Sequence, residues 1–212
     1  MDMKHIDILI ERYPCLSVCI DSIEQAAETI INSYRQGGKI LVCGNGGSCA
    51  DSDHIVGELM KGFRKKRPLS VAIKDSLINA GGKIGEKMAG SLQASLAAIN
   101  LCAHNALTTA FSNDEEPQFI YAQQVIGYAS KNDVLIGIST SGNAENVIAA
   151  GIAAKAIGVS TIGMCGETLC EMDHFFDLVI HVPERETYII QELHMPIYHT
   201  ICMIVEDHFF QE

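Results

Sequence analysis

The feature that most constrains the fold of this sequence is an alternation of short apolar runs with longer stretches of helical periodicity. Apolar runs of this length are typical of strands that are buried on both faces of a sheet. Strands that alternate with helices form right-handed βαβ units and build a parallel sheet with helices on both sides. The sequence therefore predicts an α/β fold, a three-layer αβα sandwich around a central parallel sheet of about five strands. The predicted strands are 39–44, 95–101, 133–139, 159–165 and 177–182.

Helical patterns fill most of the remaining chain, and two prolines fall inside the longest of them. The helices predicted between the strands are 48–62 and 144–158. At the ends of the chain, Pro14 is expected to break the long helical region 6–34, and Pro196 is expected to bend or interrupt the closing helix 186–210.

The segment 65–96 has the least regular pattern. Within it, 69–73 could be a strand, and 78–90 reads as a flexible loop or the start of a helix. We predict a single domain over residues 1–212, in which 1–37 form an N-terminal helical region and 65–96 have the character of an insertion.

The charge balance argues against nucleic acid as a direct partner. The chain has 15 basic and 26 acidic residues, and its net charge of −11 would repel a phosphate backbone over most of the surface. The one basic cluster, 61–67, is interpreted as a solvated loop, with a phosphate-steering patch as the alternative.

Cysteine usage and hydropathy indicate a cytoplasmic protein without a membrane segment. The eight cysteines are scattered without CxxC spacing, and the N-terminus has no signal-peptide pattern, so we expect reduced thiols in the cytoplasm. No apolar run approaches the roughly 20 residues that a transmembrane helix needs.

Two predicted strand–helix turns have the composition of a phosphate site. The first, GNGGS at 44–48, has glycines that allow close backbone approach and is followed by a helix whose free N–H groups attract an anion. It matches neither a dinucleotide fingerprint nor a nucleotide P-loop, and an ordinary turn capped by Ser48 is the alternative. In the second turn, 138–146, three hydroxyl groups in a row can bind one phosphate at the end of a strand. These belong to Ser139, Thr140 and Ser141.

Candidate acid–base and metal-binding side chains lie on two predicted helices. His54 and Glu58 are four residues apart and share a helix face, which suits a metal site or a general base with its partner, although a surface His–Glu pair has the same spacing. On the closing helix, Gln191 and His199 lie about two turns apart and roughly on one face, with His194 between them. These polar groups either are satisfied core residues or line a cavity.

Four motifs, in this order along the chain, resemble the sugar isomerase (SIS) domain proteins of the phosphoheptose isomerase group. The likeness extends over nearly the whole chain from about residue 20, except for 65–96, which looks longer than in the best-known members. The motifs are CGNGGSCADSDHIVGEL, FSNDEEP, NDVLIGISTSGN and ETYIIQELHMPIYH.

The resemblance implies an isomerase that interconverts sedoheptulose 7-phosphate and a heptose 7-phosphate, and homotetramers with active sites between subunits. Such chemistry passes through a cis-enediol and needs a base and an acid, for which Glu58 and His199 are the candidates. A zinc ion is expected with His54, Glu58, Gln191 and His199. The phosphate and sugar are expected to bind Asn45, Gly46, Gly47, Ser48, Asp114, Ser139, Thr140, Ser141, Asn143 and Gln191.

Three positions differ from the close phosphoheptose isomerases. Ala144 replaces a phosphate-binding serine, Tyr188 an acidic residue and Gly62 a basic one. All three would touch the substrate end of the site, so isomerase chemistry is better supported than heptose as the substrate. Two alternatives stay open: a non-catalytic SIS module that senses sugar phosphates or binds a protein, and a purely structural α/β oligomer that binds no sugar phosphate.

Overall fold

The computed structural model describes residues 4–210, and its centre is a sheet of five parallel strands. The strand order is β2-β1-β3-β4-β5, and Gly44 at the end of β1 pairs with Ile138 at the end of β3. The α/β class and the parallel five-stranded sheet are therefore confirmed. The strands are β1 (Ile40–Gly44), β2 (Ala98–Asn100), β3 (Val134–Ile138), β4 (Ser160–Cys165) and β5 (Leu178–His181).

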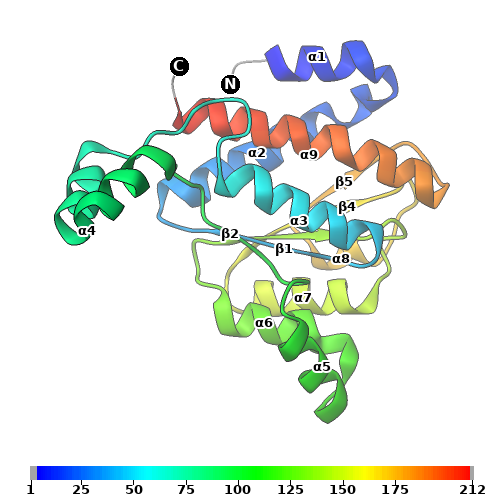
Figure 1. Cartoon of the computed structure of the whole chain (residues 1–212). Helices are drawn as coiled ribbons and strands as arrows, with labels where there is room; N and C mark the ends of the chain where they lie inside the picture. Colours follow the sequence, from blue (N-terminus) through cyan, green and yellow to red (C-terminus); the bar gives the residue numbers. More distant parts are fainter. Residues whose placement is uncertain (1–3, 211–212) are drawn as a thin grey trace.

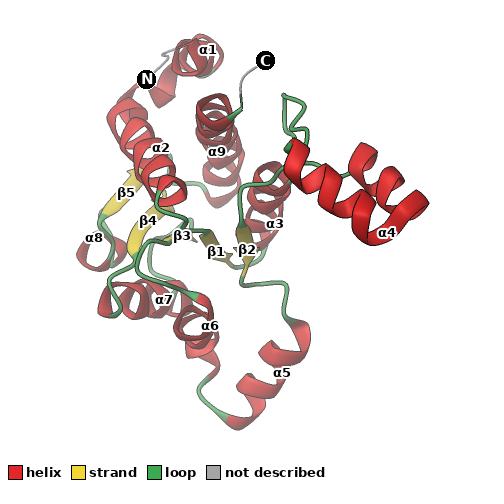
Figure 2. Cartoon of the chain, turned by 90° about the vertical axis from the view of Figure 1, so that its left-hand side faces the viewer, coloured by secondary structure: helices red, strands yellow, loops and turns green. Residues whose placement is uncertain are grey.

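Helices cover both faces of the sheet, as Figures 1 and 2 show. One face carries α2 (Ile20–Arg35), α3 (Gly47–Met60) and α9 (Thr187–Phe209), and α1 (Lys4–Arg12) packs on the outside of α9. The opposite face carries α6 (Ile120–Tyr128), α7 (Glu145–Ala156) and the short α8 (Met172–Phe175), with α5 (Asn105–Asp114) projecting beyond them. Two 3₁₀ helices, Pro14–Cys19 and Pro117–Phe119, directly precede α2 and α6.

The hydrophobic core is divided by the sheet into two clusters. Successive residues of β1 point to opposite faces, so that Ile40 and Val42 enter one cluster while Leu41 and Cys43 enter the other. All four are fully buried, which explains why this strand reads as a continuous apolar run rather than an alternating one.

The two prolines have different effects on the helices. Pro14 ends α1 and begins the 3₁₀ helix, as predicted. Of the two effects expected of Pro196, a bend or an interruption, the interruption does not occur, because α9 runs through this residue as one element of 23 residues. The Thr200 hydroxyl, one turn later, donates to the Pro196 carbonyl at 2.8 Å.

The possible strand at 69–73 is also wrong, because α4 (Val71–Ser91) occupies this part of the chain. Ser70 caps the helix by accepting a hydrogen bond from the Ile73 N–H, and Gly82, with φ of 50°, kinks it. Figures 1 and 2 show α4 projecting from the body of the molecule. None of the helices in residues 4–210 is long and apolar enough to cross a membrane.

Candidate active site

The two predicted phosphate turns lie side by side at the carboxyl edge of the sheet. They follow β1 and β3, which are neighbours, and the side chains of Asn45 and Asn146 join them through two hydrogen bonds of 2.8 and 2.9 Å. Helix α3 begins in the first turn and α7 at the end of the second, so both helices direct their positive dipole ends to this edge.

The hydroxyl-rich turn borders a cavity of ≈ 270 Å³. Thr140, Ser141 and Asn143 line it, while Ser139 is buried behind them with its Oγ 3.5 Å from the Ser141 Oγ. The Ser141 Oγ also accepts the Asn143 N–H at 3.2 Å, so the turn is held in shape by its own side chains. Three charged residues also line the cavity: Arg185, which pairs with Glu167, and Glu184.

The glycine turn contacts helix α9 through Gln191. Gly46 has a φ of 56°, which favours glycine, and a Cβ on Gly47 would lie 2.5 Å from the Gln191 Nε2. The Gln191 amide therefore rests directly on the turn. Ser48, the next residue, is 3% exposed.

Helices α3 and α9 run in the same direction, and two turns further along they bring His54, Glu58 and His199 together. The His54 Nε2 lies 3.2 Å from the Glu58 Oε1 and 3.3 Å from the His199 Nε2. The Tyr198 hydroxyl lies 3.0 Å from the His54 Nδ1 and donates to Asp51 at 3.1 Å. The His54 ring is thus contacted at both nitrogens.

Burial lowers the pKa of His199, and the neighbouring His54 lowers that pKa further against the opposing effect of Glu58. The His199 imidazole is therefore kept neutral in neutral solution, where it can both accept and donate a proton. Burial also raises the pKa of Asp51, partly offset by its hydrogen bond from Tyr198.

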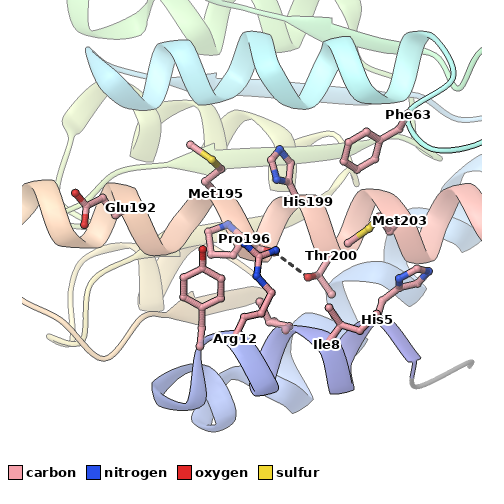
Figure 3. Close-up of a pocket in the computed structure, with 12 residues that line it drawn as sticks. His5, Ile8, Arg12, Phe63, Glu192, Met195, Pro196, His199, Thr200 and Met203 are labelled. Atoms are coloured by element: carbon pink, nitrogen blue, oxygen red, sulfur yellow. Dashed lines mark hydrogen bonds between the residues drawn. The ribbon is translucent and has the colours of Figure 1, made fainter.

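A second cavity, of ≈ 360 Å³, opens on the other side of His199 between α1 and α9. Figure 3 shows His199 beside Phe63, with Arg12 reaching from α1 toward α9. The rings of Phe63 and His199 are 5.4 Å apart. Met195 and Ile8 leave apolar surface exposed at this cavity.

The predicted metal set divides into two places. His54, Glu58 and His199 offer ligand atoms within 4.8 Å of one another, whereas Gln191 contacts the glycine turn about 12 Å along α9 from His199. The Glu58 Oε2 is buried and has no hydrogen-bond partner among residues 4–210. Two imidazoles and one carboxylate are the donors of many catalytic zinc sites, so the three residues fit such an ion.

Two further predicted polar residues lie elsewhere in the chain. Asp114 is exposed at the end of α5, and this helix lies on the opposite side of the sheet from α3 and α9. His194 is fully buried in the core, and burial lowers its pKa to about 4, so its imidazole is neutral.

The comparisons with known proteins agree with this geometry. The SIS domain family matches residues 17–89 and 88–166. A phosphoheptose isomerase of Clostridium acetobutylicum is 37% identical over 193 residues, which are 91% of this chain and 85% of the relative. The chain belongs to the phosphoheptose isomerase group of the SIS family. A phosphoheptose isomerase of Burkholderia pseudomallei is 35% identical over 89% of this chain and 83% of its own.

Solved structures of the group share the fold. The phosphoheptose isomerase of Neisseria gonorrhoeae superposes with a TM-score of 0.74 at 28% identity, covering 96% of both chains. That of Francisella tularensis gives 0.71 at 27% identity, covering 96% of this chain and 93% of its own.

Four residues that contact the site of this SIS-family chain were not predicted from the sequence. Asp51 precedes His54 by one helical turn and Tyr198 adjoins His199, so both could have been found from their spacing. Asn146 and Phe63 gave no comparable signal, because their partners are distant in the sequence.

The interpretation of 61–67 as a solvated loop is wrong at its last residue. Arg67 is 1% exposed and pairs with the buried carboxylate of Glu206 on α9.

Proposed function

We propose that this protein is an aldose–ketose isomerase that interconverts sedoheptulose 7-phosphate and D-glycero-D-manno-heptose 7-phosphate. The observation that carries the proposal is the placement of Glu58 and His199 around His54, with side-chain atoms within 4.8 Å of one another, in a chain that matches phosphoheptose isomerases over about nine-tenths of its length. The paired turns at the carboxyl edge supply the phosphate site that such a substrate needs.

The proposed reaction is a proton transfer between two carbons of the open-chain sugar. Glu58 removes a proton from C1 of the ketose, and His199 supplies a proton to the carbonyl oxygen at C2, which gives a cis-enediol. Return of the carbon-bound proton to C2 and loss of the proton from the C1 hydroxyl give the aldose. The Tyr198–His54 contact orients the imidazole next to both groups.

A zinc ion is the cofactor we propose, held by His54, Glu58 and His199. When bound, it would polarise the carbonyl or fix the orientation of these side chains. Gln191 belongs with the phosphate turn in this proposal, because its amide rests on Gly47.

We also propose that the site is completed between subunits of a homotetramer. Two features support this: α5, which ends at Asp114, lies on the opposite side of the sheet from α3 and α9, and the cavity beside His199 has an exposed apolar rim. Light scattering should give about four times the chain mass of 23.0 kDa. A monomer with full activity would contradict the shared site.

The test of function is incubation of the purified protein with sedoheptulose 7-phosphate in deuterium oxide, with and without zinc. Isomerisation with deuterium incorporated beside the carbonyl supports the proposal. Exchange only with other ketose phosphates, such as fructose 6-phosphate, would refute sedoheptulose 7-phosphate as the substrate and identify another. Binding without exchange would refute catalysis and favour a sensor.

A further inference from the structure

A buried ion pair next to the site has no role in the reaction as proposed. Arg67 follows α3 and Glu206 lies on α9, seven residues after His199. Their side chains are 0% and 1% exposed, and the Glu206 Oε1 accepts from the Arg67 Nε at 2.8 Å and lies 2.7 Å from its Nη2. Burying two charges is costly, and well-packed apolar residues often serve stability equally well, so the pair calls for an explanation.

The Arg67 side of the pair holds the end of helix α3. Its Nη1 donates to the Leu59 carbonyl at 2.7 Å and its Nη2 to the Glu58 carbonyl at 3.0 Å. These carbonyls belong to the last turn of α3, where a helix has no N–H partners of its own. The guanidinium therefore fixes the backbone of the candidate base.

The Glu206 side holds the loop that follows α3. Its carboxylate accepts the backbone N–H groups of Phe63, Arg64 and Lys65 at 2.9, 2.9 and 3.2 Å. Burial alone would raise the pKa of Glu206, but these donors and Arg67 outweigh it and lower the pKa, so the carboxylate stays charged. Phe63, fixed in this way, places its ring against His199.

We propose that Arg67 and Glu206 are positioning residues that hold Glu58 and His199 at the separation that proton transfer requires. The pair joins the backbone of Glu58 to the helix that carries His199, and it braces the His199 ring through Phe63. Side chains two or more contacts from the reacting atoms control the rate in this way when small displacements weaken the reactive geometry. The inference rests on the isomerase activity proposed above.

The test compares Arg67→Lys and Glu206→Gln with Asp133→Asn as a matched control. Asp133 is also a buried carboxylate that accepts backbone N–H groups and pairs with a lysine, but it lies at the opposite edge of the sheet from the site. Kinetics are measured at a temperature where thermal unfolding shows every variant to be fully folded.

We expect kcat to fall about 10- to 100-fold in both pair variants with KM within about threefold, whereas Asp133→Asn keeps kcat within about twofold despite lower thermal stability. Hydrogen exchange at residues 63–65 should accelerate in Glu206→Gln. Unchanged kcat in the pair variants, or an equal loss in the control, would overturn the positioning role. Absence of turnover in the unmodified protein would instead refute the proposed function, which separates the two failures.

Discussion

Replacing Glu58 by glutamine is the most direct test of the proposed chemistry. The substitution keeps the shape of the side chain and removes its negative charge, and with the charge its ability to take a proton. A positioned general base contributes about 10²- to 10⁴-fold to the rate, or roughly 3–5 kcal/mol of barrier. The Glu58 side chain is 13% exposed, so water has little access to replace it, and we expect a loss near the upper end, about 10³-fold or more.

The same substitution should leave the fold and the binding of substrate intact. The Glu58 Oε2 has no hydrogen-bond partner among residues 4–210, and its Lys61 neighbour lies 3.8 Å away with a side chain that is 62% exposed. Such a pair contributes little, so unfolding free energy should change by less than about 1 kcal/mol. The assay is deuterium exchange beside the carbonyl, with Glu28→Gln on the exposed side of α2 as the control. Exchange within tenfold of the unmodified rate would refute Glu58 as the base.

Three further outcomes are expected. Gly47→Ala places a Cβ 2.5 Å from the Gln191 amide nitrogen, so it should displace this amide and raise KM at least about tenfold with little loss of stability. The control Gly127→Ala, on the opposite face of the sheet, should change neither KM nor stability. Equal kinetics for the two variants would contradict the role of the Gly47–Gln191 contact. Burial lowers the pKa of His194 from 6.5 to about 4, so on acidification the unfolded chain binds this proton before the folded chain does, and the free energy of unfolding should fall by roughly 3 kcal/mol from pH 7 to 4. His194→Met should reduce this pH dependence, as measured by urea titrations at each pH. The same pH dependence in both proteins would contradict the prediction. Calorimetric titration should show that His199→Ala weakens zinc binding at least about tenfold while Gln191→Ala does not. The reverse result would identify Gln191 as a zinc ligand.

The sheet could be predicted from the sequence because its signal is local. The central strands β1 and β3 are buried on both faces and appear as apolar runs between helical patterns, and the alternation of strands with helices implies parallel pairing. The prediction of a strand at 69–73 was wrong for the same reason, because it rested on a local signal: Val71 and Ile73 are β-branched residues typical of strands. Their side chains are 73% and 50% exposed, and the local cap at Ser70 decides for a helix where no neighbouring strand competes.

The roles of charged and polar residues were harder to predict, because their partners are far away in the chain. A basic cluster is usually solvated, and nothing near Arg67 indicates that Glu206, 139 positions later, will bury it. The sequence alone does not distinguish the role of His194 from that of His199. Their rotation about α9 separates them, since one faces the core and the other faces α3.

A regular spacing nevertheless relates the two helices of the site. Gly47 and His54 are seven residues apart on α3, and Gln191 and Tyr198 are seven residues apart on α9. Seven residues are nearly two turns, so each pair lies on one face of its helix. Because the helices run in the same direction, a single alignment brings Gln191 onto Gly47 and Tyr198 onto His54. The glycine turn and the group of His54, Glu58 and His199 are therefore positioned by one packing contact, and a shift of α9 along α3 would disturb both at once.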